Sequence, residues 1–182
     1  MKTKILTIGS LTKDLFLSPR RELLIDQSGH SCLAFCLGDK IRIEEKHHSF
    51  GGGGANVAVG LSRLGCEVAV LGAVGNDSEG REIQRHLQDE GVSIGFLQTS
   101  KKESAFSTIL SASSGERIVF FAPGASSDFL DFDAALLSKV DAVCLEHLPS
   151  ASDHVFQKIH EHFQEFPEKF LSWNPGREAL EK

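Results

Sequence analysis

The chain has 182 residues, of which 41% are hydrophobic and 24% are charged, so it is long enough for one globular domain, or part of one, with a real core. Its formal net charge of −6 and pI near 5.7 argue against nucleic acid as a partner, because binding a polyanion requires a basic surface. No apolar run approaches the roughly 20 residues that span a bilayer, and no signal-peptide core follows Met1, so we expect a cytoplasmic protein without a membrane partner.

The first predicted element is a buried strand from Lys4 to Gly9, a short apolar run that ends at a glycine. Ligands of α/β sheets gather at the carboxyl ends of the strands, and Asp14 comes just after this end. A carboxylate at this place can accept hydrogen bonds from two neighbouring hydroxyls, which suits a polyol. The alternative is a solvated loop aspartate, because aspartate is a common turn residue.

Residues 15–48 are predicted to form a β hairpin inserted after the first strand. Apolar residues alternate from 33 to 37, and a second strand begins at residues 41–43, across the turn Gly38–Asp39. A hairpin alone is marginal in water, so pairing with a second copy of the chain would stabilise it.

The cysteines and histidines of this segment indicate no metal site. Cys32 and Cys36 lie in an apolar strand-like run at even spacing, which favours two small buried side chains. His47 and His48 are adjacent and do not converge on one ion, so we interpret them as surface residues. His160 and His162, two positions apart on a predicted helix, are interpreted in the same way.

Gly51 to Gly54 are the most informative stretch of the chain. Four consecutive glycines leave the backbone N–H and C=O groups uncovered and free to take positive φ, so a ligand can approach the main chain. Val57, Leu61 and Leu64 follow at i, i+4 and i+7, which predicts an amphipathic helix with these residues on its buried stripe. The glycine loop therefore leads into a helix N-terminus, which attracts oxygen-rich ligands. A simple tight turn is the alternative, but it does not explain four glycines followed by Asn56.

This glycine pattern matches neither of two common nucleotide-binding motifs. G-x-G-x-x-G would require a glycine at Asn56 or Val57, and no Gly-Lys-Ser/Thr occurs in the chain. Gly-Gly-x-Gly-x-Asn-x-Ala, with further glycines at 65, 72 and 75, resembles the N-terminal signature of the ribokinase-like (PfkB) family of carbohydrate and nucleoside kinases.

The resemblance implies a set of substrate-binding residues. It implies that Asp14 binds the sugar and that the loop and helix start contribute Gly51, Gly52, Gly53 and Asn56. In some sugar kinases a lysine stands at the position of Gly53. The resemblance also implies that residues 15–48 are a β lid over the sugar, which often pairs with the lid of a second subunit to give a homodimer.

After the loop, the pattern alternates between strands and helices. Residues 66–72 are a second buried strand, and Asp77 or Ser78 caps the next helix, whose core stripe contains Ile83 and Leu87. Because capping already explains Asp77, we interpret it as structural, although the family has a similar Gly-x-Asp-x-x-Gly.

The later elements include one more candidate site residue. Residues 105–112 and 117–122 are predicted to form a hairpin. Residues 140–146 are predicted to form a central strand that ends at Glu146. The carboxylate of Glu146 would then face the ligand crevice at the carboxyl ends of the strands. The resemblance implies the same role, because some family members use a glutamate there near the sugar. A helix ending before Pro167 and a strand at 169–173 follow.

Alternating strands and helices with apolar strand cores predict an α/β fold with a doubly wound, mostly parallel sheet, a ribokinase-like three-layer arrangement. The resemblance covers nearly all of residues 1–182 but only the N-terminal, sugar-binding portion of a family member. We therefore expect a partial domain that lacks the C-terminal part of the fold. In the family, the later part supplies a segment tied to Mg²⁺, the adenine pocket and a catalytic Gly-Ala-Gly-Asp. Gly124–Asp128 is not that motif, because it lacks a required glycine.

These observations predict the sugar-binding portion of an ATP-dependent kinase acting on a sugar or nucleoside hydroxyl. ATP and Mg²⁺ are implied by the family, and this chain is expected to contain no catalytic residue and no metal ligand. Phosphoryl transfer needs a base and charge stabilisation, so we expect the chain to be inactive alone. The alternatives are a non-catalytic polyol- or nucleoside-binding module, a dimerisation module, or one half of a split kinase. Phe170–Trp173 resembles an inner strand without neighbours, which favours truncation.

Overall fold

The computed structural model describes residues 2–20, 23–128, 131–148 and 153–176. The chain divides into two compact units, each described here by itself. The predicted lid, residues 15–48, lies inside the second unit, which also takes in a later hairpin. The first unit contains Met1–Lys13, Phe50–Ala105 and Pro123–Lys182, and the second contains Asp14–Ser49 and Phe106–Ala122.

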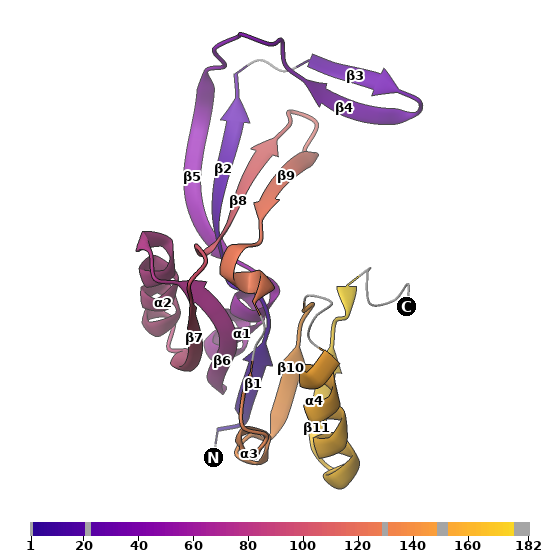
Figure 1. The fold of residues 1–182 in the computed structure, drawn as a ribbon. Helices are drawn as coiled ribbons and strands as arrows, with labels where there is room; N and C mark the ends of the chain where they lie inside the picture. The colour runs from indigo at the N-terminus through magenta and orange to yellow at the C-terminus, as the bar shows by residue number, and fades with distance from the viewer. Residues whose placement is uncertain (1, 21–22, 129–130, 149–152, 177–182) are drawn as a thin grey trace. The chain divides into compact units, whose positions relative to one another are not determined.

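The first unit is built on a five-stranded sheet in the order β11-β10-β1-β6-β7, in which every neighbouring pair is parallel (Figure 1). The predicted doubly wound parallel sheet is therefore confirmed. The strands are β1 (Lys4–Ile8), β6 (Glu67–Gly75), β7 (Ser93–Ser100), β10 (Ala142–Leu145) and β11 (Phe170–Trp173).

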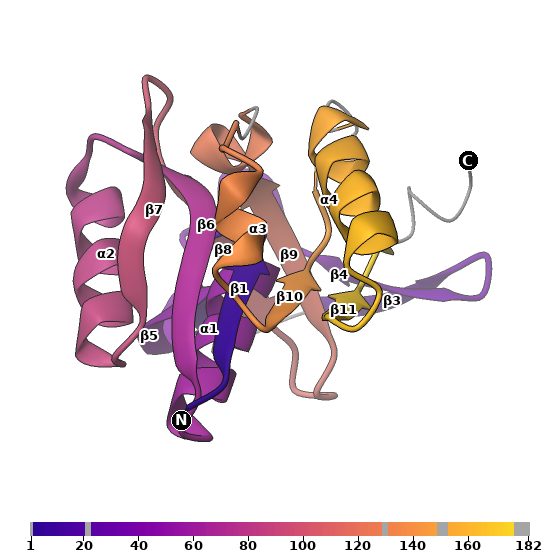
Figure 2. The same cartoon turned by 90° about the horizontal axis from the view of Figure 1, so that it is seen from below.

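Helices pack on both faces of this sheet, which explains why its strands are apolar on both sides (Figure 2). Along β6, Val70 and Val74 join one core with helix residues Ala58 and Ile83, while Leu71 joins a second core on the other face. The first core contains α1 (Gly53–Arg63) and α2 (Ser78–Asp89), and the second contains α3 (Ala135–Ser138) and α4 (Asp153–Glu165). The 3-10 helix η1 (Gly124–Ser127) contributes Ala125 to the second core.

The order of the strands creates a switch point between β1 and β10. From central β1 the chain adds β6 and β7 on one side, then crosses to add β10 and β11 on the other. In sheets of this kind, ligands bind outside the carboxyl ends of the two strands that flank the reversal. Gly9 follows β1 there, and Glu146 follows β10, with its backbone N–H donating to the Ile8 carbonyl at 2.8 Å.

Helix α1 buries a different face from the predicted one. Leu64 is 81% exposed, and Leu61 is only partly buried. The helix lies so close to the end of β1 that a Cβ on Gly54 would lie 2.9 Å from the carbonyl carbon and oxygen of Gly9. Only small side chains fit this contact. The predicted stripe is therefore wrong for Leu64, whereas Leu61 packs at the edge of the core. The buried residues of α1 are Gly54, Ala55 and Ala58.

The second unit contains a four-stranded sheet in the order β5-β2-β8-β9 and a separate two-stranded ribbon of β3 and β4. The predicted hairpin in residues 105–122 is confirmed, with antiparallel register from Phe106↔Ala122 to Ser111↔Arg117. The strands are β2 (Thr12–Pro19), β3 (Leu23–Gln27), β4 (His30–Ala34), β5 (Ile43–Gly51), β8 (Ala105–Ser111) and β9 (Arg117–Ala122).

The inserted segment turns earlier than predicted. The hairpin of β3 and β4 reverses at Ser28 and Gly29, which both have positive φ, and the Asp26 carboxylate accepts a hydrogen bond from the Gly29 N–H at 3.0 Å. This local bond stabilises the turn. Because β4 pairs with β3 from this turn onward, β4 ends at Ala34, opposite the first residue of β3. Gly38 therefore lies in an irregular segment before β5.

The prediction that both cysteines of this segment are buried is wrong. Cys36 is exposed and Cys32 is only partly buried. Because β4 ends at Ala34, Cys36 lies beyond the strand and does not share a face with Cys32. His47, His48 and His160 are exposed, as predicted. The prediction is wrong for His162, which is buried on α4.

The helix and strand predicted near the C-terminus are both present. Val155 and Ile159 of α4 are buried, and the helix ends at Glu165, just before Pro167. Strand β11 lies at one edge of the sheet, where Phe170 is 65% and Trp173 is 50% exposed. Among the described residues, no helix is long and apolar enough to cross a membrane.

Candidate functional site

The glycine loop lies directly on the backbone that follows β1. Gly52 caps α1 with φ of 89°, and a Cβ at this position would lie 2.3 Å from the Ser10 carbonyl oxygen. Ser10 supports the loop through two hydrogen bonds. Its hydroxyl accepts from the Gly53 N–H at 3.2 Å, and its carbonyl accepts from the Ala55 N–H at 3.4 Å. Gly52 is therefore required both by its backbone conformation and by lack of space.

Glu146 lies against this loop at the switch point. A Cβ on Gly53 would lie 2.9 Å from the Glu146 Cβ and 3.0 Å from its Oε2, and a Cβ on Gly9 would lie 2.8 Å from the same Cβ. The Glu146 side chain is buried, and its Oε2 accepts a hydrogen bond from Asn174 Nδ2 at 3.0 Å. The structure thus brings together Glu146 and Gly53, two residues that the sequence predicted separately.

Sequence reasoning missed Asn174 as part of this cluster. It follows β11 as Glu146 follows β10, and its backbone N–H donates to the Leu145 carbonyl at 2.8 Å. The signal was available, because the carboxyl ends of adjacent parallel strands lie at one edge of a sheet.

The remaining predicted site residues occupy different environments. Gly51 is the buried last residue of β5. Asn56 lies in the first turn of α1 with its side chain exposed, and its backbone N–H donates to the Gly52 carbonyl at 2.9 Å. Asp14 belongs to the second unit, where it is the partly buried third residue of β2 and therefore lies in a strand rather than a loop.

Lys13, immediately before Asp14, is a charged residue that the sequence analysis did not single out. It is 8% exposed, and its Nζ lies 2.8 Å from Glu82 Oε2 and 3.8 Å from Glu79 Oε1 on α2. Because these two carboxylates compensate the charge of a buried ammonium, they hold Lys13 against α2 within the first unit. Nothing in the spacing of the sequence pairs residue 13 with residues 79 and 82.

The prediction that Asp77 caps a helix is confirmed. Asp77 Oδ1 accepts from the Gly80 N–H at 2.7 Å and from the Ser104 hydroxyl at 2.6 Å, and Oδ2 accepts from the Ser104 N–H at 2.6 Å. The Ser104 hydroxyl in turn accepts from the Gly75 N–H at 2.9 Å. Burial alone would raise the pKa of Asp77, but the bonds from Ser104 and Gly80 hold that pKa below its ordinary value.

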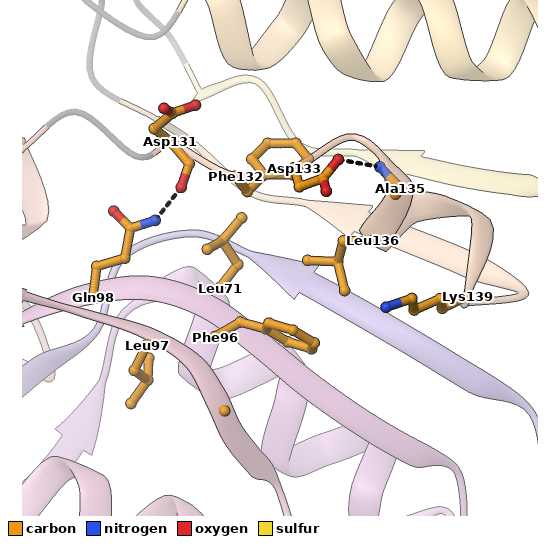
Figure 3. Close-up of a pocket in the computed structure, with 11 residues that line it drawn as sticks. Leu71, Phe96, Leu97, Gln98, Asp131, Phe132, Asp133, Ala135, Leu136 and Lys139 are labelled. Carbon is orange, nitrogen blue, oxygen red and sulfur yellow. Dashed lines mark hydrogen bonds between the residues drawn. The ribbon is translucent and has the colours of Figure 1, made fainter.

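A separate cavity of about 330 Å³ lies between β6, β7 and residues 131–139 of the first unit (Figure 3). Leu71, Phe96 and Leu136 give it an apolar lining, and the Gln98 side chain donates a hydrogen bond to the Asp131 carbonyl at its edge. None of the predicted site residues lines this cavity. It lies on the face of the sheet that carries α3, whereas the glycine loop begins α1 on the other face.

The described part of the chain contains no group of three or more His, Cys, Asp or Glu side chains that could hold a metal ion. The site at the switch point instead offers main-chain groups, one carboxylate and one carboxamide. Such a set can bind the hydroxyl groups of a ligand by accepting and donating hydrogen bonds.

Among known proteins, the chain is similar to sugar and nucleoside kinases. Residues 4–166 match the model of the pfkB family carbohydrate kinases. The chain is 31% identical over 132 residues to an uncharacterized sugar kinase of Archaeoglobus fulgidus, covering 68% of this chain and 50% of the relative. It is 29% identical over 139 residues to a nucleoside kinase of Methanothermobacter thermautotrophicus, covering 75% and 44%.

The fold is similar to that of solved ribokinases. The ribokinase from Cryptococcus neoformans in complex with ADP superposes with a TM-score of 0.72 at 22% identity, covering 96% of this chain and 50% of that one. The chain therefore spans about half the length of the relatives that it matches.

Proposed function

Because the chain belongs to the pfkB family of carbohydrate kinases, we propose that it forms the acceptor-binding portion of an ATP-dependent kinase that phosphorylates a hydroxyl of a sugar or nucleoside. The observation that carries this proposal is the packing of the Glu146 carboxylate against the glycine loop at the switch point, 3.0 Å from the Cβ position of Gly53. This arrangement places a carboxylate and a main chain without side chains where α/β sheets bind their ligands.

We assign the binding of the acceptor to the predicted residues. The main chain of Gly51, Gly52 and Gly53 allows a sugar to approach closely because no side chain covers it. Asp14 and Glu146 would accept hydrogen bonds from acceptor hydroxyls, and the exposed Asn56 carboxamide can both donate and accept. Asn174 would orient Glu146 through its 3.0 Å hydrogen bond.

Transfer of a phosphoryl group requires more than these residues supply. The acceptor hydroxyl needs a base within hydrogen-bond reach, and the transferred group needs charge stabilisation. The family uses ATP, and Mg²⁺ would neutralise phosphate charge when bound. The described residues contain no group of three or more His, Cys, Asp or Glu side chains that could hold a metal ion, and we assign no step of the reaction to a metal. We propose that the chain binds the acceptor and is inactive alone.

We also propose a homodimer through the lid, residues 15–48, and a strand of the same unit outside the lid supports pairing there. Three consecutive apolar residues of the edge strand β9 are about half exposed, namely Val119, Phe120 and Phe121. An edge strand with such side chains is a template for pairing with another chain. A cytoplasmic location remains part of the proposal and rests on the family.

Isothermal titration of the 182-residue chain with a panel of pentoses, ketohexoses and nucleosides tests the proposal. We expect saturable binding of at least one of these polyols. We also expect about a tenfold loss of affinity in Asp14→Asn, since a charged acceptor of hydroxyl hydrogen bonds becomes neutral. Asp39→Asn, which changes an exposed aspartate of the same unit, is the matched control.

Two further results bear on the alternatives. Absence of binding across the whole panel would contradict the proposed function and leave the dimerisation module as the better explanation. ADP formation by the purified chain with ATP, Mg²⁺ and any bound acceptor would contradict its inactivity. Complementation of activity by a separate polypeptide would instead identify one half of a split kinase.

A further inference from the structure

The turn that follows β11 is tied to the end of β10 by side chains of the first unit. The Asn174 N–H, one residue past β11, donates to the Leu145 carbonyl at 2.8 Å. Beyond this bond, Asn174 Nδ2 donates to Glu146 Oε2 at 3.0 Å. His147 Nδ1 lies 3.0 Å from the Pro175 carbonyl oxygen. The connection between the two strands therefore continues past the sheet itself.

The His147 ring is the donor in the last of these bonds. A carbonyl oxygen can only accept, so Nδ1 carries the proton. The ring also lies against the backbone of Gly176, where a Cβ would lie 2.6 Å from Nδ1 and 3.0 Å from Cγ. Gly176 has φ of 71°, so both its conformation and the lack of space require a glycine. The ring is thus in contact with two consecutive residues of the turn.

Few rotations separate the bond at Pro175 from Asn174. The pyrrolidine ring fixes φ of Pro175, and the residue before a proline is restricted to extended backbone. Fixing the Pro175 carbonyl therefore restricts Asn174, whose carboxamide holds Glu146 Oε2. Because a carboxylate is planar and rigid, restraint of one oxygen orients both. His147 can thus act on the side chain of its neighbour Glu146 through the turn.

We propose that His147 is a positioning residue of the acceptor site, which orients the Glu146 carboxylate through Pro175 and Asn174. This inference rests on the proposed function, because it takes Glu146 as a residue that binds the acceptor. His147 is exposed, so its hydrogen bond adds little to the stability of the fold. Loss of the bond should therefore change affinity for the acceptor much more than folding.

Two replacements of His147 separate its N–H from the rest of the ring. Asparagine Nδ2 and histidine Nδ1 are both bonded to Cγ, so His147→Asn retains a donor at nearly the same place. His147→Phe retains the shape of a ring but has no donor. His160→Phe is the matched control, because His160 is an exposed histidine whose ring contacts Gln164 on α4, away from the turn.

Titration calorimetry with D-ribose, D-fructose and adenosine tests the proposal, and thermal melts establish that each variant is folded. We expect His147→Phe to weaken binding about fivefold, with Tm changed by no more than about 2 °C. His147→Asn and His160→Phe should remain within about twofold of the unmodified chain. In an Asn174→Ala background, His147→Phe should cause no further loss, because its effect passes through Asn174.

Three outcomes would overturn the inference. Unchanged affinity in His147→Phe would show that the turn holds Asn174 without this bond. An equal loss in His147→Asn would show that the N–H is not what matters. A loss that persists in the Asn174→Ala background would show that His147 acts by another route. In each case, binding that is weakened by Glu146→Gln would leave the proposed function intact. If none of the three ligands nor any other acceptor of the panel binds, the proposed function fails and this inference fails with it.

Discussion

Replacement of Gly54 by alanine tests the close contact between α1 and the end of β1. Gly54 is the second residue of the helix, and an alanine Cβ there would lie 2.9 Å from both the carbonyl carbon and the oxygen of Gly9. Contacts this short require a shift of several tenths of an ångström. Both partners are backbone, so a rotamer change cannot provide that shift. The glycine loop and β1 would have to separate, which disturbs the site that both of them form.

The magnitude follows from two opposing effects. Overpacking of a well-packed site costs about 1–3 kcal/mol, whereas alanine in place of glycine inside a helix stabilises by up to about 1 kcal/mol. We therefore expect Gly54→Ala to lower the free energy of unfolding by about 1–2 kcal/mol. For a chain of this length, that corresponds to a decrease in Tm of roughly 2–8 °C.

Gly60 on the same helix provides the matched control. No atom lies within 4 Å of a Cβ built at Gly60, and its φ is not in the left-handed region. Gly60→Ala should therefore raise the free energy of unfolding by about 0.5–1 kcal/mol. Urea denaturation followed by circular dichroism measures both variants. A Gly54→Ala protein that is as stable as the unmodified chain, or more stable, would refute the close contact on which our description of the loop depends.

Three further predictions concern single side chains. Asp77 has a lowered pKa in the folded state, so its contribution to stability is present above about pH 4 and is lost as the pH falls through the folded pKa. Asp77→Asn should therefore lower the free energy of unfolding at pH 7. It should also reduce the decrease of this free energy between pH 6 and pH 2.5, as denaturation curves at each pH measure it. An unchanged decrease would contradict this. Burial and, to a lesser degree, the charge of Lys169 lower the pKa of His162, although Glu165 and Glu168 oppose this. Because the unfolded chain then binds a proton more readily than the folded chain, the free energy of unfolding should decrease as the pH falls below about 6.5. His162→Leu should reduce that slope between pH 7 and 5, and urea titrations at each pH measure it. Glu146→Gln should weaken acceptor binding about tenfold with little change in Tm, because the amide retains the shape but not the charge; calorimetry that shows unchanged affinity would remove Glu146 from the site.

The sheet was predictable because its signals are local. Buried parallel strands read as short apolar runs that end at glycine or a polar residue, as β1, β6 and β10 do. The same logic placed Glu146 at the ligand edge, because a residue at the carboxyl end of a parallel strand faces the crevice. The family was predictable because the glycine pattern has fixed spacing over residues 51–75.

What the sequence did not predict depends on contacts between distant segments. The buried face of α1 consists of small residues, and a hydrophobic pattern cannot distinguish an alanine that packs closely on a backbone from one that is merely a good helix former. Lys13 pairs with α2, more than sixty residues later, and neither segment contains a signal for the other. The turn at Ser28–Gly29 was not predicted because Gly38–Asp39 is an equally good turn by composition. The hydrogen bond from the Gly29 N–H to the Asp26 carboxylate stabilises the turn at Ser28–Gly29.

Ser10 and Leu11, in the three-residue connection between β1 and β2, have a consequence for protein engineering. Ser10 accepts two hydrogen bonds from the glycine loop, and Leu11 is fully buried. We therefore expect this connection to tolerate neither insertion nor deletion, although short loops between strands are usually where libraries introduce diversity. A library that aims to change the ligand should keep residues 10–11 constant. It should instead randomise residues 37–40, which precede β5 and are all exposed.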